Sequence, residues 1–233
     1  MMKVILIFLL VVANGCHSQQ VQKDANSVFH GDMVLSVYLV RHAESKKNVA
    51  HLPWTPEEEL DTLTVKGRRQ AAAIGRFLKD KGIVAVLSSP ADRARETAQA
   101  ISQVIGLKRG YEVEKAFASL RPGKDRDGNQ MSWAWREKQW AQGQDPRPEG
   151  GESLLDGEIR AKNALNRLSE RFYGMAVVIV SHGDICAALL GHAENAPMSK
   201  RYVLHNVPTG SVSELIMTDT GWHVLEEGRQ PFE

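Results

Sequence analysis

VLSVYLVRH, residues 34–42, and MAVVIVSHG, residues 175–183, are the two stretches that decide the fold. Each begins as a short apolar run rich in β-branched residues, which predicts a buried strand, and each run is followed by a histidine. Strands buried on both faces are typical of a parallel sheet covered by helices. Further strands are expected at 83–87, 111–113, 211–217 and 222–225.

Helical segments lie between these strands. Thr64 can cap a helix that runs to about Lys81 and stops at Gly82. Ser88-Ser89-Pro90 can cap a helix from about 91 to 105. Two more helices are expected at 153–173 and 185–190. Strands that alternate with helices predict an α/β fold, a three-layer sandwich with a mostly parallel central sheet and helices on both faces.

One long segment interrupts this alternation. Residues 123–151 are polar and rich in Gly, Pro and Trp, so we expect a functional loop or lid inserted around 121–151. It contains Trp133, Trp135 and Trp140, which could form an apolar wall for a substrate or could pack the lid onto the domain.

The N-terminal segment is expected to stand apart from this domain. Lys3 precedes an apolar run at 4–13 that is too short to span a bilayer, which indicates a secretory signal. Ala13-Asn14-Gly15-Cys16 resembles the cleavage site of a bacterial lipoprotein, although an ordinary signal peptide beside a cysteine is an alternative. The expected organisation is a signal peptide at 1–15, lipidation of Cys16, a polar tether at 16–32 and the domain at 33–233. The protein would then be anchored at the periplasmic face of a membrane.

Charge and cysteine content argue against several other classes of protein. Lys plus Arg number 29 and Asp plus Glu number 28, which argues against binding nucleic acid through a basic face. If Cys16 is lipidated, Cys186 has no disulfide partner, and its apolar surroundings favour a core position. His182 and His192 are a poor pair for a metal, so neither a metal nor another cofactor is expected.

Four potential cations are expected at one edge of the sheet. Arg41 and His42 follow the first strand, His182 follows a later one, and Arg93 lies one turn into the helix after the second strand. In parallel sheets the active site lies beyond the carboxyl ends of the strands. Such a cluster is costly unless an anion sits among its members, and phosphate suits paired arginine hydrogen bonds.

The segment Arg41-His42-Ala43-Glu44-Ser45, with Asn48, resembles the signature of the histidine phosphatase superfamily, in the branch that contains phosphoglycerate mutases (branch 1). Ala43 stands where that family has Gly. The resemblance extends in order over about residues 34–217. Its later blocks are Leu63-Thr64-Val65-Lys66-Gly67 with Gln70-Ala71, Ser88-Ser89-Pro90 with Arg93-Ala94 and Glu96-Thr97-Ala98, Gly151-Glu152-Ser153-Leu154 with Asp156 and Arg160, Ser181-His182-Gly183, and Asn206.

The resemblance implies a role for each matching residue. His42 would be the nucleophile that takes the phosphoryl group, while Arg41, Arg93 and a cationic His182 would hold the phosphate. For attack, one ring nitrogen of His42 must be unprotonated and the other held by a hydrogen bond. Asn48 would contact the substrate or order its loop. Glu152 would position the phosphate pocket or serve a structural role beside Ser153, a candidate helix N-cap.

The family's usual general acid is absent from its expected place. A Leu-x-Glu segment normally supplies it, and this chain has Leu120-Arg121-Pro122. Asp125 is the preferred replacement, with Asp127 and Glu114 as alternatives. A site for leaving groups that need little protonation is another interpretation.

Together these features predict a phosphatase that hydrolyses a small-molecule or envelope-associated phosphate monoester through a phosphohistidine intermediate on His42. A phosphoglycerate mutase-like phosphotransferase is the first alternative, and export weighs against it because its substrates are cytoplasmic. A catalytically silent binding lipoprotein is the second.

Overall fold

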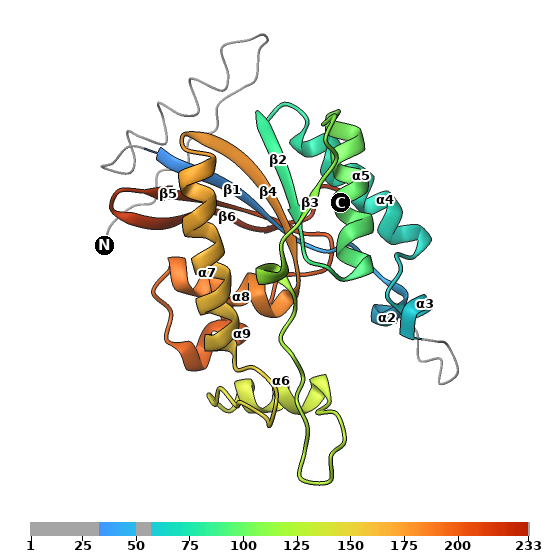
Figure 1. The fold of residues 1–233 in the computed structure, drawn as a ribbon, viewed down its shortest axis with the longest axis vertical. Coiled ribbons are helices and arrows are strands. Elements are labelled where there is room, and N and C mark those ends of the chain that lie inside the picture. Colours follow the sequence, from blue (N-terminus) through green and yellow to red (C-terminus); the bar gives the residue numbers. More distant parts are fainter. Residues whose placement is uncertain (1–32, 50–56, 233) are drawn as a thin grey trace, which may run out of the picture.

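The computed structural model describes residues 33–49 and 57–232, so the expected signal peptide, the tether and Cys16 lie outside the described residues. The described strands form one sheet in the order β3-β2-β4-β1-β5-β6 (Figure 1). Their bounds are β1 Met33–Arg41, β2 Ile83–Ser88, β3 Glu112–Val113, β4 Met175–Ser181, β5 Val212–Thr218 and β6 Gly221–Arg229.

Most strand pairs in this sheet are parallel. β4 pairs in parallel with both β1 and β2, and β2 pairs in parallel with β3. β5 runs antiparallel to β1, and β6 antiparallel to β5. The β1–β4 register places Arg41 opposite Ser181, so His42 and His182 leave neighbouring strands at the same level. The predicted mostly parallel sheet is confirmed.

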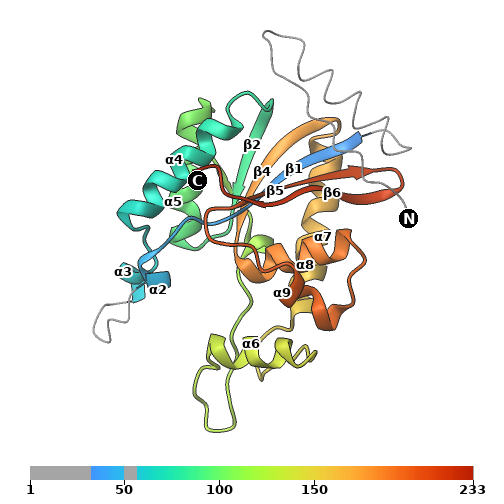
Figure 2. The same ribbon diagram turned by 180° about the vertical axis from the view of Figure 1, so that it is seen from behind.

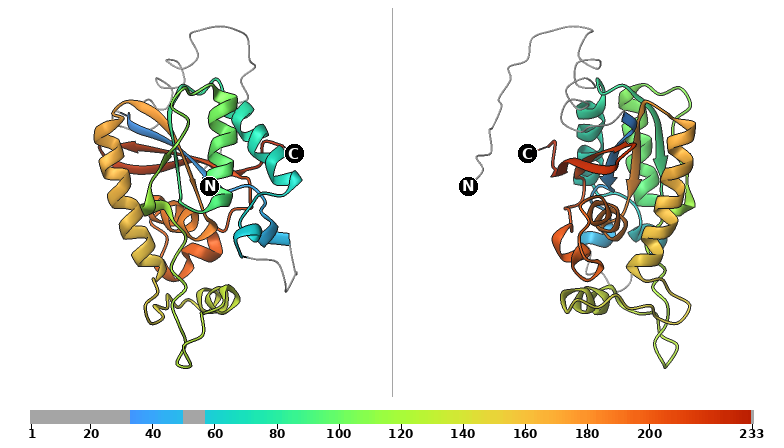
Figure 3. Two further views of the ribbon diagram at one scale, coloured as in Figure 1. Left: turned by 45° about the vertical axis from the view of Figure 1, so that its right-hand side comes forward. Right: turned by 90° about the vertical axis from the view of Figure 1, so that its left-hand side faces the viewer.

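Helices cover both faces of the sheet. Their bounds are α2 Lys46–Val49, α3 Glu57–Leu60, α4 Val65–Leu78, α5 Asp92–Ile105, the 3₁₀ turn η1 Lys115–Phe117, α6 Trp133–Ala141, α7 Leu154–Arg171, α8 Gly183–Ala193, η2 Met198–Lys200 and α9 Arg201–Leu204. Figures 2 and 3 show α4 and α5 on one face and α7 and α8 on the other. Alternate residues of β1 enter the two cores, Tyr38 and Val40 one of them and Val37 and Leu39 the other. The three-layer prediction is therefore confirmed.

The start of α4 holds the chain segment that follows His42. The Thr64 hydroxyl caps the helix by accepting from the Gly67 backbone N–H at 2.9 Å, and Gln70 Oε1 accepts from the Glu44 N–H at 2.9 Å. A Cβ on Gly67 would lie 1.9 Å from the Glu44 carbonyl oxygen, so only glycine permits this approach. α4 ends at Leu78, earlier than the predicted Lys81.

The insertion around 121–151 differs from the predicted irregular segment because it contains the helix α6. Figure 1 shows α6 beyond the end of the sheet at which β4 leads into α8. The fully buried Arg136 anchors it, donating to the carbonyl oxygens of Glu152 at 2.6 Å and Arg121 at 2.7 Å. These tertiary bonds stabilise a helix whose own sequence gives little helical signal.

Two further properties concern the described part of the chain. No helix within 33–49 or 57–232 is both long and apolar enough to cross a membrane. Cys186 is buried in the core between α8 and the sheet, and burial raises the pKa of its thiol to about 12. The predicted core position of Cys186 is confirmed.

Candidate active site

The structure brings Arg41, His42, Arg93 and His182 together where β1, β4 and the start of α5 meet. The rings of His42 and His182 have centroids 5.2 Å apart and lie edge to face, at 60°. Arg93 bridges them, because its Nε lies 3.1 Å from His42 Nε2 and its Nη2 lies 2.9 Å from His182 Nδ1. Parallel strands deliver the two histidines, and a helix that begins beside them delivers the arginine.

The hydrogen bonds of His42 define its tautomer. Its Nδ1 lies 2.8 Å from the Ala43 carbonyl oxygen, which can only accept, so Nδ1 carries the proton. Its Nε2 faces the Arg93 Nε–H, which can only donate, so Nε2 carries a lone pair. This is the arrangement that an attacking imidazole requires.

Burial keeps both histidines neutral. Removal from solvent, followed by the charge of Arg93, lowers the pKa of His42 to about 3. The same two causes, together with His42 and Arg41, hold the pKa of His182 well below its usual range. The expected cationic His182 therefore differs from the structure, in which its Nδ1 accepts from Arg93. An anion bound among these groups would raise the pKa of both rings.

Ser89 has a different role from the predicted helix cap. α5 begins at Asp92 with Ala91 as its N-cap, and the Ser89 hydroxyl lies 2.7 Å from His182 Nε2. Because His182 Nδ1 accepts from Arg93, its Nε2 carries the proton and donates to Ser89 Oγ. Ser89 thus fixes the tautomer and the orientation of His182.

The Arg41 guanidinium has one buried nitrogen, Nε, without a hydrogen-bond partner. Its Nη1 donates to the Val207 carbonyl oxygen at 2.6 Å and to Asn206 Oδ1 at 3.1 Å. An unpaired buried N–H is costly, and a phosphoryl oxygen would satisfy it.

Asp61 belongs to this cluster although the sequence did not single it out. Its Oδ1 accepts from Arg93 Nη1, and its Oδ2 accepts from the Asp92 backbone N–H at 2.8 Å. The signal that could have found it is weak, because Asp61 ends an acidic stretch at 57–61 that carries no motif to distinguish one acid from another. Only the fold shows which acid of that stretch meets Arg93.

With this geometry established, comparison with known proteins is informative. The family model of the histidine phosphatase superfamily (branch 1) matches residues 37–229. The chain belongs to the histidine phosphatase superfamily. The probable phosphoglycerate mutase GpmB of Salmonella typhi is 27% identical over 199 residues, which cover 81% of this chain and 88% of that protein.

Solved structures share the histidine phosphatase fold. Bacillus stearothermophilus YhfR has a TM-score of 0.68 at 24% identity, covering 85% of this chain and 100% of that one. A mycobacterial glucosyl-3-phosphoglycerate phosphatase solved with VO3 has a TM-score of 0.65 at 24% identity, covering 82% and 97%. At 24% identity, both matches show that this chain shares the fold.

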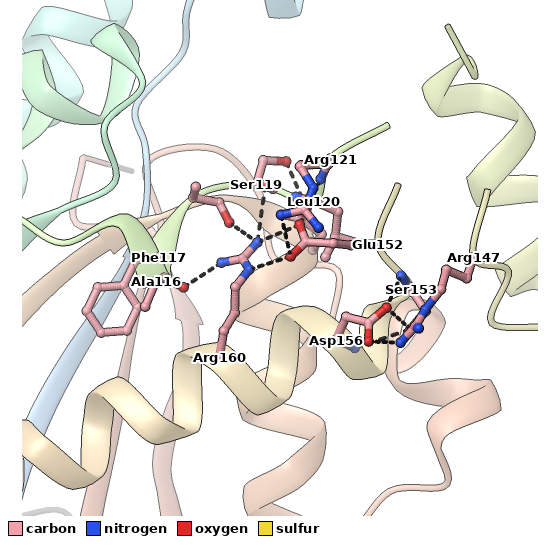
Figure 4. A network of polar contacts seen from close by, with 12 residues as sticks. Ala116, Phe117, Ser119, Leu120, Arg121, Arg147, Glu152, Ser153, Asp156 and Arg160 are labelled. Atoms are coloured by element: carbon pink, nitrogen blue, oxygen red, sulfur yellow. Dashed lines mark hydrogen bonds and ion pairs between the residues drawn. The ribbon is translucent and has the colours of Figure 1, made fainter. Parts of the chain in front are cut away.

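Glu152 has a structural role in this member of the histidine phosphatase superfamily (Figure 4). Its buried carboxylate accepts from Arg160 Nε at 3.0 Å and from the Arg121 backbone N–H at 2.9 Å. Arg160 in turn donates to the carbonyl oxygens of Ala116 and Ala118. Glu152 therefore fixes the segment between η1 and residue 121, which favours the structural alternative over a direct phosphate contact.

Ser153 and Asn48 also take local roles. Ser153 is the N-cap of α7, and with Asp156 it forms a capping box. Asn48 Oδ1 accepts from the backbone N–H of Ser45 at 2.9 Å and from its hydroxyl at 2.8 Å. Asn48 thus orders the loop after His42, and a substrate contact stays a prediction.

Two of the Trp residues of the insertion, Trp133 and Trp140, pack against aromatic side chains. Trp140 is buried and stacks on Tyr202 of α9 at a centroid distance of 4.2 Å. Trp133 lies edge to face with Trp140 at 5.5 Å and is 38% exposed. This contact attaches α6 to the domain, as the packing alternative expected, and leaves part of Trp133 open to solvent.

One surface groove is lined by residues other than those of this cluster. It has a volume of about 660 Å³ and includes none of the predicted site residues. Its lining residues are Lys66, Arg69, Gln70, Ala73, Arg76, Phe77, Pro231 and Phe232. The candidate site is therefore identified by its chemistry and not by the size of a cavity.

Asp125, the preferred proton donor, lies in a tight turn of the insertion. Its carboxylate accepts from the backbone N–H groups of Asp127 and Asn129, both at 2.9 Å, and the bonds to Asn129 lower its pKa below the ordinary value. A proton donor at neutral pH needs a raised pKa instead. Asp125 could therefore act as the general acid only if the hydrogen bonds of this turn were rearranged.

The assignment of Asp125 as the acid predicts a selective effect of Asp125→Asn. Its kcat on an alkyl phosphate is expected to fall about 100-fold, while an aryl phosphate with a good leaving group is hydrolysed almost normally. Steady-state kinetics on both substrates measure this. Asp127→Asn, in the same turn, tests the alternative proton donor. Full activity of Asp125→Asn on the alkyl phosphate would exclude the role.

Proposed function

We propose that this protein is a phosphatase that hydrolyses a phosphate monoester through a phosphohistidine on His42. The observation that supports it most is the His42 tautomer, with Nδ1–H bound to the Ala43 carbonyl and an unprotonated Nε2 beside Arg93. The unpaired buried Nε of Arg41 and the N–H groups of Arg93 supply donors for the phosphoryl oxygens.

The reaction divides into two displacements at phosphorus. In the first, the Nε2 lone pair forms an N–P bond while the P–O bond to the leaving group breaks, and the leaving oxygen takes a proton from the general acid, for which Asp125 is the candidate. In the second, a water oxygen attacks phosphorus, the N–P bond breaks, the conjugate base of that acid takes the proton lost by water, and His42 returns to its neutral form. The arginines stabilise the charge that spreads over the equatorial oxygens in both steps.

The phosphotransferase alternative has support from similarity to a probable phosphoglycerate mutase. A mutase would pass the phosphoryl group from His42 to a second hydroxyl, whereas a phosphatase passes it to water. A silent binding protein would not form the N–P bond. Export and lipidation at Cys16 stay predictions from the sequence, as does the choice between a soluble and an envelope-associated substrate.

Trapping of the intermediate tests this proposal. The protein is mixed with a radiolabelled phosphomonoester and quenched into alkali within milliseconds, because a phosphoramidate survives base. We expect label on His42, located by peptide mass spectrometry, and inorganic phosphate as the product. Absence of label at every quench time during turnover would exclude the covalent mechanism. Transfer to an added alcohol or sugar, without free phosphate, would favour the phosphotransferase.

A further inference from the structure

Asp61 binds Nη1 of Arg93, the guanidinium nitrogen that faces neither histidine. The three nitrogens of the Arg93 guanidinium each have their own partner: Nε faces His42, Nη2 faces His182, and Nη1 donates to Asp61. The Asp61 and Arg93 side chains are only 19% and 16% exposed, so this ion pair is shielded from most of the solvent. A planar group held at all three nitrogens has little freedom to rotate.

The second oxygen of Asp61 anchors this contact to the backbone. Oδ2 accepts from the N–H of Asp92 at 2.8 Å, and Asp92 is the residue directly before Arg93 at the start of α5. One carboxylate therefore binds both the helix start and the side chain that leaves it. Arg93 has four side-chain torsions to order, and this bridge restricts them before a substrate arrives.

We infer that Asp61 is a positioning residue, which holds the Nε–Nη2 edge of Arg93 toward the reacting phosphoryl group. This inference rests on the proposed function of the same site. Both oxygens of Asp61 accept from N–H donors, one at the Arg93 side chain and one at the Asp92 backbone. Its effect on the reaction passes through Arg93.

If Asp61 positions Arg93, its replacement should lower kcat. Arg93 stabilises charge that grows in the transition state, and a misplacement of about 1 Å can cost about 100-fold in rate. In Asp61→Asn an amide N–H faces a donor, either at Arg93 or at Asp92. We expect kcat on an aryl phosphate to fall 10- to 100-fold with KM changed less than threefold. The kcat of Asp61→Ala, which introduces no opposing donor, is expected to fall as well.

Asp92→Asn is the matched control for this experiment. It removes a carboxylate one residue from Arg93, but that carboxylate is half exposed and pairs with Arg95 instead. Its kcat should stay within twofold of the wild type. Thermal unfolding of each variant shows that the kinetics refer to folded protein, and Asp61→Ala carries the test if Asp61→Asn does not fold.

A double-mutant cycle separates positioning from a general structural effect. If Asp61 acts through Arg93, adding Asp61→Asn to Arg93→Lys should cost less than threefold, far less than in the wild type. A full additional loss, or a kcat equal to that of Asp92→Asn, would overturn the inference while leaving the phosphatase intact. A wild type that forms no phosphohistidine and releases no phosphate would instead overturn the proposed function.

Discussion

Replacement of His42 by Asn is expected to lower kcat for phosphate release by about four orders of magnitude, the scale of removing a catalytic nucleophile. The Asn side-chain amide can still donate to the Ala43 carbonyl, as Nδ1 of the ring does at 2.8 Å. No atom then occupies the position of Nε2, so no N–P bond can form. The four orders correspond to about 5.5 kcal/mol of lost transition-state stabilisation.

The measurement is a continuous phosphate-release assay with an aryl phosphate, beside a vanadate-binding titration. His192→Asn is the control, because His192 lies in the last turn of α8, at the opposite end from His182, and pairs with Glu158. It should stay within about twofold of wild-type kcat. Vanadate affinity of His42→Asn should survive within about tenfold, since Arg41 and Arg93 are unchanged. More than a tenth of wild-type activity in His42→Asn would refute the nucleophile assignment.

Replacement of Arg93 by Lys is expected to lower kcat by about 10²–10³-fold, the usual effect of removing one preorganised donor set from a transition state. Lys keeps the positive charge but offers a single ammonium. That group cannot face His42, His182 and Asp61 at once, as the guanidinium does through three separate nitrogens. The loss of kcat in Arg93→Lys therefore reflects the geometry of the guanidinium contacts more than the positive charge.

The same assay on Arg95→Lys provides the comparison. Arg95 lies on the exposed side of the same helix and pairs with Asp92, so its kcat should be unchanged. If Arg93→Lys matched the wild type in kcat and differed only in KM, Arg93 would serve binding alone, and its role in the transition state would be wrong.

Much of the fold was predictable from local patterns. The apolar run before Arg41 and the run 175–180 are strands because β-branched side chains suit a sheet covered on both faces. Thr64 starts α4 as expected, since its hydroxyl satisfies the free N–H of Gly67. Such signals lie within a few residues of each other, so they can be recognised in the sequence without knowledge of the fold.

The helix α6 shows where local patterns fail. Its segment looks irregular because Gly and Pro flank a short helix rich in Trp. What holds it is the burial of Arg136 against carbonyl oxygens of residues 121, 122 and 152, together with the contact of Trp140 with Tyr202. The carbonyl partners lie 14 to 16 residues from Arg136 and Tyr202 lies in a different helix, so the periodicity of a short segment does not reveal them.

The candidate site likewise has some features that local sequence predicts and others that depend on the fold. Local patterns were enough to predict that His42 and His182 follow buried strands and that Arg41 and Arg93 accompany them, because strand ends and helix starts are local features. The folded structure was needed to show that Asp61 binds Arg93, that Ser89 orients His182 and that both histidines are neutral. Hydrogen-bond partners and burial depend on groups tens of residues apart, and these fix the tautomer and pKa that the chemistry of His42 requires.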